Sequence, residues 1–279
     1  MSNELTNPNG SGVPDYLKDM TKREKIGNLD ESDRIVPRVQ LLQAISPEVT
    51  TFDEAKPGTF WHNLAQVDLG NKLLAVPIIV RKSYILWAPR NDDRQILARS
   101  MDCVHWDVPN AEFTVKPKGS AQPVVYRTRG SVRESGLSEF GSSFPGDPNS
   151  PPAASLTYNT LWFLIDNPEL SPIVLINTRS QIKPTQQLYN RIDMRPVAHY
   201  AQAWEIGITQ EKGQEGPYFN VSYKAAGYPP LEIAEFCKGM YERYRQIDWR
   251  ATDEEESDGG GFANSGKTVD GESHSDSKF

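Results

Sequence analysis

The sequence predicts a β-rich α+β fold, namely an OB-like Greek-key barrel with insertions and a C-terminal helix. Many short apolar segments with the alternation typical of strands follow one another closely, and only a few segments have the period of a helix. Twenty glycines and 21 prolines punctuate the chain, as many tight turns require. The alternation does not distinguish a barrel from a sandwich.

Strand signals fill the middle of the chain. Strands are expected over residues 36–45, 72–87, 94–100, 112–116, 124–128, 154–165 and 171–177, followed by a hairpin over 203–224. The strand over 72–87 should break near Pro77, because proline donates no ladder hydrogen bond. In the hairpin, alternation places Trp204, Ile206 and Ile208 on one face, and likewise Phe219, Val221 and Tyr223.

Helical periodicity appears late in the sequence. Residues 183–194 have Pro184 in the first turn and Leu188 and Ile192 four residues apart, which predicts a one-faced helix. Residues 231–247 predict the longest helix, and a short one is expected over 13–26. The apolar stripe of the long helix comprises Ile233, Phe236, Cys237, Met240, Tyr244 and Ile247.

Composition excludes several classes of protein. The longest clean apolar run, residues 73–80, is far shorter than the roughly 18 residues that a membrane span needs. The first residues lack the pattern of a secretory signal. Cys103 and Cys237 stand alone in the sequence, so neither a zinc site nor a disulfide scaffold is expected, and both suit the reduced thiols of a cytoplasmic protein.

Charge divides the 279 residues into three parts: a polar N-terminal arm (1–33), one β-rich core (34–251) and a disordered acidic tail (252–279). The tail has eight acids and two bases, and the arm seven acids and four bases, so the net charge of -7 leaves the core at +2. Within the core, residues 81–133 carry ten bases against five acids. This distribution favours a polyanion-binding surface, although ordinary solvated charge with a solubilising tail would have the same composition.

Aromatic residues are interleaved with this basic stretch. Strand alternation places Lys82 and Tyr84 on one face, with Arg81 and Trp87 on the other. Single-strand binders combine cations that follow the phosphates with flat side chains that stack on bases. Each aromatic taken alone is more often a core residue, and Trp162 and Trp204 are assigned to the core on that basis.

Other motifs are given structural interpretations. Residues 261–268 match the P-loop pattern. The sequence predicts no strand before them and no helix after them, so the match is attributed to chance. The segment 101–107 gathers Asp102, Cys103 and His105 and is interpreted as a turn near a strand rather than a metal or thiol site. His62 and His199 are isolated and are expected to be structural.

Several stretches of the sequence together resemble bacteriophage single-stranded-DNA-binding proteins of replication and recombination. The resemblance is carried by VPRVQLLQAISPEV, AKPGTF, SPIVLINTRSQIKPTQQLYNRI, GPYFNVSYKAAG and the closing helix. It implies an OB-type core that binds single strands without reading sequence. It also implies a flexible acidic tail, ending in an aromatic residue, that contacts a polymerase, helicase or nuclease in the cytoplasm of the infected host.

The leading hypothesis is a non-enzymatic single-stranded-DNA-binding protein with no cofactor, metal or membrane partner. The residues expected to neutralise phosphates are Arg81, Lys82, Arg90, Arg99, Lys116, Lys118, Arg127, Arg129 and Arg133. The expected stacking residues are Tyr84, Trp87, Trp106 and Tyr126. The partner-binding tail would act through Asp253, Glu254, Glu255, Glu256, Asp258 and Phe279.

Two alternatives belong to other classes of protein. One is a virion structural or assembly protein without DNA affinity, and the other is an enzyme with a site around Cys103 and His105. Oligomeric state, site size and the preference for DNA over RNA are left open by the sequence.

Overall fold

The structure, a computed structural model, describes residues 36–89, 94, 96–116, 122–144, 146–213 and 216–246. The predicted N-terminal arm, the helix over 13–26, the acidic tail, Arg90 and Lys118 lie outside these residues, so the domain boundaries stay predictions. The described residues confirm a β-rich α+β fold with few helices. The OB-like barrel is not confirmed, because within the described chain the main sheet is an open, curled half-barrel.

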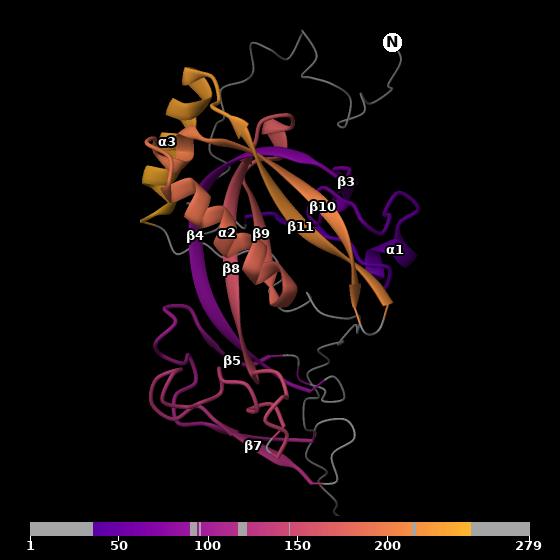
Figure 1. The fold of residues 1–279 in the computed structure, drawn as a ribbon, viewed down its shortest axis with the longest axis vertical. Coiled ribbons are helices and arrows are strands. Elements are labelled where there is room, and N and C mark those ends of the chain that lie inside the picture. Colours follow the sequence, from indigo (N-terminus) through magenta and orange to yellow (C-terminus); the bar gives the residue numbers. More distant parts are fainter. Residues whose placement is uncertain are drawn as a thin grey trace, which may run out of the picture. The chain divides into compact units, whose positions relative to one another are not determined.

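Among the described residues, nine strands form this main sheet (Figure 1). Its order is β11 (Gly216–Gly227), β10 (Ala203–Gly213), β4 (Leu73–Trp87), β8 (Ala154–Leu164), β9 (Ile173–Thr178), β1 (Arg38–Leu41), β2 (Phe60–His62) and β3 (Val67–Asp68). The ninth strand, β5 (Ile96–Ser100), pairs with the far end of β4. The β1–β9 ladder is parallel.

Strand β4 is the longest strand of this sheet. It runs for 15 residues without the interruption expected at Pro77, so that expectation was wrong. Instead, the ladder between β4 and β8 shifts register between Pro77 and Ile79 and then continues. A shift is the expected response to a residue that cannot donate its own ladder hydrogen bond. Strand β10 pairs with the first part of β4 and β5 with the last part.

Helix α2 (Ile182–Asp193) covers one face of the sheet and α3 (Leu231–Tyr244) the other (Figure 1). Leu188 and Ile192 of α2 pack with Trp162 and Trp204 in the first core cluster. On the opposite face, the α3 side chains of Cys237 and Met240 pack against apolar residues of β4, β8 and β9. Burying apolar side chains on both faces is what holds the sheet and the helices together.

A separate cluster of buried apolar residues covers the far ends of β4 and β8. We call this part the lobe; it comprises β5, the two-stranded ribbon of β6 (Glu112–Val115) and β7 (Val124–Arg127), and the loops up to residue 153. Trp106, Tyr126 and Leu137 pack there against Leu86 of β4 and Ala154 of β8. The lobe is therefore built on the same two long strands as the rest of the sheet.

The curl of the sheet brings the segment after β1 against β11. The side chain of Gln43 bonds to the main chain of Phe219 on β11, and the Phe219 ring lies over Gly58. Arg191 of α2 donates to the carbonyl of Tyr223 on the same strand at 3.2 Å. Side chains thus occupy part of the edge of β11, where a closed barrel would place a neighbouring strand.

Most long elements agree with the sequence prediction, and several short ones were missed. The two strands of the 203–224 hairpin, β8, β9, α2 and α3 lie close to their expected positions, and Trp162 and Trp204 are fully buried as expected. The missed elements are β2, β3, the short helix α1 (Pro47–Thr51) and the 3-10 turns η2 (Pro168–Leu170), η3 (Arg179–Gln181) and η4 (His199–Ala201). Phe236, expected in the buried stripe of α3, is 58% exposed.

Within the described part of the chain, no helix combines the length and the apolar character needed to cross a membrane.

Candidate functional site

An aromatic pocket of about 840 Å³ lies where the lobe meets the start of α2. Its floor is formed by the face of β4 and β8 that carries Tyr84 and Leu156. One wall comes from the lobe, with Phe140 and Phe144 in the loop that follows β7. Arg179 of η3 also lines the pocket. The pocket therefore combines several aromatic side chains with one cation.

Three of the predicted stacking residues line this pocket, namely Tyr126 of the lobe and two residues of β4, Tyr84 and Trp87. Strict alternation would have placed Tyr84 and Trp87 on opposite faces of β4. The β4–β5 ladder, however, shifts register between Leu86 and Trp87, so alternation ends just before Trp87. Burial raises the pKa of the Tyr84 phenol, with smaller contributions from Cys103 and Tyr158. The tyrosine is therefore a neutral, flat surface at neutral pH.

Trp106 and Tyr126, the predicted stacking residues outside β4, both lie in the core of the lobe, and their stacking role stays a prediction. Trp106 is 4% exposed and Tyr126 is 3% exposed, and both belong to the core cluster of the lobe. Tyr126 donates its hydroxyl to the carbonyl of Ser143 at 2.8 Å, which fixes the loop that forms the pocket wall. The Tyr126 ring therefore lines the pocket as well as packing in the lobe core, whereas Trp106 belongs to the lobe core and is not a lining residue.

Lys82 and Arg81 point to opposite faces of β4, as alternation predicted. The exposed Lys82 ammonium lies 5.6 Å from the ring centre of Tyr158, its cross-strand partner on β8. Tyr84 follows two residues later, on the Lys82 side of the strand. Arg81 instead donates to the carbonyl of Tyr244 at the end of α3, on the other side of the sheet. The structure thus separates these two predicted phosphate contacts.

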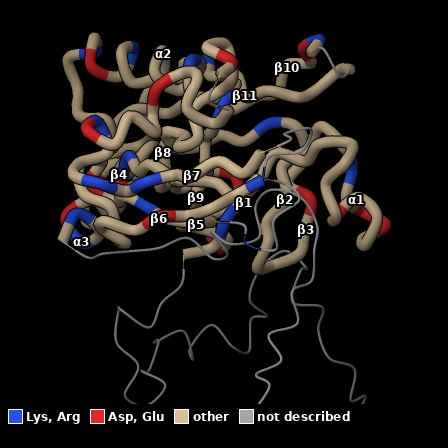
Figure 2. The backbone as a smooth tube through the Cα atoms, turned by 90° about the horizontal axis from the view of Figure 1, so that it is seen from below, with Lys and Arg blue, Asp and Glu red and all other residues tan. Residues whose placement is uncertain are grey.

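The remaining predicted cations are spread over the lobe. Arg99 lies on β5, where its main chain pairs with Asp107 at 2.7 and 2.8 Å. Arg127 forms an ion pair of 2.8 Å with Glu112 across the β6–β7 ribbon, and both side chains are largely exposed. Figure 2 shows Lys and Arg segments interspersed with Asp and Glu segments around these strands. Lys116, Arg129 and Arg133 are also exposed.

Two wall residues and one cation of the pocket were missed by the sequence analysis. Phe140, which is 75% exposed, and Phe144 lie in the Gly-, Ser- and Pro-rich loop over 136–152, where the sequence analysis predicted no strand, helix or site residue. Two phenylalanines in an otherwise polar loop are a signal that could have been used. Arg179 was not among the predicted site residues, because its place in the pocket depends on the tertiary fold.

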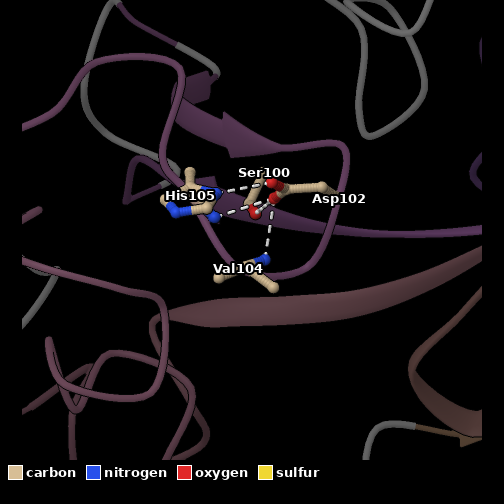
Figure 3. A network of polar contacts seen from close by, with 4 residues as sticks. All are labelled: Ser100, Asp102, Val104 and His105. Carbon is tan, nitrogen blue, oxygen red and sulfur yellow. Dashed lines mark hydrogen bonds and ion pairs between the residues drawn. The ribbon is translucent and has the colours of Figure 1, made fainter.

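The segment 101–107 is a turn, as the sequence interpretation held (Figure 3). Asp102 accepts hydrogen bonds from the main-chain N–H groups of Val104 and His105, at 2.8 and 2.7 Å, and also pairs with the His105 ring at 2.7 Å. These bonds hold the pKa of the Asp102 carboxyl far below its usual range. Burial raises the pKa of the Cys103 thiol at the tip of the turn, which disfavours the reactive thiolate.

The two isolated histidines have structural partners. Nδ1 of His62 accepts the N–H of Ala65 at 3.0 Å, and its Nε2 faces the carbonyl of Leu170 at 3.4 Å. Nε2 of His199 lies 2.8 Å from the carbonyl of Ile78. Burial lowers the pKa of both rings, so each is neutral near pH 7. Among the described residues, no group of three or more potential metal ligands comes together.

The fold and this pocket define a β-rich α+β protein with a curled sheet, a small lobe and an aromatic site between the lobe and α2. Residues 5–250 match the family model of the Pam3 phage gp34-like proteins, and the chain belongs to that family. The expectation of a bacteriophage protein is thereby confirmed, while single-stranded-DNA binding stays a prediction. No curated protein and no solved structure matches the chain.

Proposed function

We propose that the protein binds single-stranded DNA without enzymatic activity, through the pocket between the lobe and α2. The observation that carries this proposal is that Tyr84 and Trp87 line one pocket together with Phe140 and Phe144. Unpaired bases stack on such rings, at about 1–3 kcal/mol per base, whereas the bases of a duplex are already stacked on each other.

The cations nearest to these rings are Lys82 and Arg179. Arg179 lines the pocket, and Lys82 lies on the same face of β4 as Tyr84. A cation next to a stacking ring can contact the phosphate of the base that is stacked there. Membership of a phage protein family is consistent with a role in phage DNA replication or recombination, where single strands are exposed.

The binding test uses fluorescence anisotropy with a labelled oligo-dT of about 30 nucleotides and a matched duplex, at two salt concentrations. We expect binding to the single strand that weakens with salt, and much weaker binding to the duplex. Failure to bind the single strand at low salt would overturn the proposal and would favour a virion structural or assembly role, which co-sedimentation with particles would test.

Tryptophan fluorescence locates the binding site. Of the described tryptophans, Trp61, Trp106, Trp162 and Trp204 are at most 4% exposed, and only Trp87 is partly exposed. DNA should therefore quench the emission of Trp87, and Trp87→Phe should remove most of the quenching. Trp249→Phe is the control for the tryptophan outside the described residues. Quenching that survives Trp87→Phe would place the DNA elsewhere.

A matched pair of phenylalanine variants separates the pocket from general surface hydrophobicity. Phe140 in the pocket wall is 75% exposed, and Phe236 on α3 is 58% exposed. Phe140→Ala should weaken binding by roughly five-fold or more, which corresponds to the loss of about 1 kcal/mol of stacking. Phe236→Ala should leave binding unchanged. Equal effects of the two changes would contradict a role for the pocket.

The acidic tail belongs to the same proposal as a segment that contacts partner proteins and competes with DNA. Deletion of residues 252–279 should tighten DNA binding at low salt, because the tail carries a net charge of -6. Unchanged affinity would remove the tail from the binding mechanism.

A further inference from the structure

The cations predicted from the sequence do not form one continuous row across the described surface. Arg81 donates to the end of α3 on the far face of the sheet, while Lys82 points to the face that carries Tyr84. Arg127 is held by Glu112 on the side of β7 opposite Tyr126. A long phosphate backbone laid on the core would therefore meet acids as well as bases (Figure 2).

The pocket, by contrast, is lined by residues from three parts of the chain. These are the strands β4 and β8, the loop with Phe140 and Phe144, and Arg179 with Ile182 of α2. Its volume of about 840 Å³ falls within the roughly 300–1,000 Å³ typical of sites for one small ligand. A site that follows a strand over many nucleotides is instead an extended groove.

The position of Arg179 is fixed by its surroundings. Its backbone has a φ of 50°, in the left-handed region that residues other than glycine seldom adopt. On one side, Thr178 pairs with Thr157 of β8, and on the other the buried Asn220 donates to the carbonyl of Ser180 at 3.3 Å. Uncommon backbone conformations that neighbouring residues hold in place are frequent at ligand sites.

We propose, on the basis of the function above, that the protein has a short local site that takes about one or two nucleotides, and not a long groove. The bases stack between Tyr84, Trp87 and the phenylalanines of the lobe. Lys82 and Arg179 neutralise the phosphates of that unit, so about two phosphates are contacted however long the strand is.

The dependence of affinity on salt tests this directly. For single strands, the slope of log K against log salt is about -0.7 for each phosphate contacted, and the number of binding registers on a long strand does not change it. We would measure this slope by anisotropy for labelled oligo-dT of about 4, 8 and 20 nucleotides. The expected slope is near -1.4 for all three lengths.

Two substitutions that each remove one positive charge test which arginine contacts a phosphate. Arg179→Gln should make the slope shallower by about 0.7 at every length, whereas Arg127→Gln, the matched control on the outer side of the lobe, should not change it. A slope that steepens from 4 to 20 nucleotides, or a loss with Arg127→Gln equal to that with Arg179→Gln, would overturn the local site and leave single-strand binding intact. Absence of binding at every length would instead overturn the proposed function itself.

Discussion

The carboxamide of Gln43 pairs with the main chain of Phe219 as a neighbouring strand would. Its Nε2 donates to the Phe219 carbonyl and its Oε1 accepts the Phe219 N–H, both at 2.9 Å. One side chain thereby satisfies the donor and the acceptor of a residue at the edge of the sheet. The pair links the segment after β1 to β11, 176 residues away in the sequence.

Gln43→Ala should therefore destabilise the protein, because it removes both hydrogen bonds and leaves a partly buried peptide group without them. We expect a loss of about 1–3 kcal/mol in the free energy of unfolding, measured by urea denaturation. Gln210→Ala is the matched control, since Gln210 is the exposed cross-strand partner of Phe219 on β10. Equal losses in the two variants would show that the Gln43 bonds add nothing.

Gly58 provides a second test of the same contact. Gly58 and Gly70 have nearly equal φ values, 78° and 79°, so alanine is strained at both positions. A Cβ at residue 58 would also lie 2.8 Å from the Phe219 ring, whereas nothing lies within 4 Å of a Cβ at residue 70. Gly58→Ala should lower the thermal midpoint more than Gly70→Ala does. Indistinguishable midpoints would mean that the ring moves aside without cost.

The stability that the Asp102 carboxylate contributes to the fold should depend on pH. The pKa of its carboxyl is lowered in the folded state, so the carboxylate stabilises the fold fully above the ordinary carboxyl pKa of about 4. This contribution is lost as the pH falls from there toward the folded pKa. In urea titrations, Asp102→Asn should be less stable than the parent protein at pH 7, and the difference should shrink at pH 3. A difference that does not depend on pH would contradict a role for the charge.

The two thiols should react slowly and in a fixed order. Burial raises the pKa of Cys237 to about 12, and it also raises the pKa of the partly exposed Cys103. Iodoacetamide at pH 8, followed by mass spectrometry, should modify Cys103 slowly and Cys237 only when denaturant is added. Rapid modification of Cys103 in the folded protein would indicate an activated thiol and would favour the enzymatic alternative.

The long elements were predictable because their signals are local. Alternation around Trp204 and Tyr223 identified the hairpin, and the four-residue spacing of Leu188 and Ile192 identified α2. Strands as short as β3, with two residues, contain too few positions for any period to appear. Such strands form because the longer strands supply partners for them.

The site was predictable only in part. Tyr84 and Trp87 were identified by their position among basic residues, although their common pocket depends on a register shift that alternation cannot predict. Trp106 was predicted to stack because it lies within the basic stretch, and its burial to 4% exposure in the lobe depends on contacts that are distant in the sequence. Arg179 reaches the pocket through the packing of η3, for which no local pattern exists.

The lobe is an insertion between two strands that are already neighbours. Leu86 and Ala154 face each other across the β4–β8 ladder, so the lobe begins and ends at almost the same place in the sheet. The entropic cost of closing such a loop grows only with the logarithm of its length, so the rest of the sheet can tolerate large changes here. Related phage chains could therefore lengthen, shorten or exchange this segment while the sheet and its two helices persist.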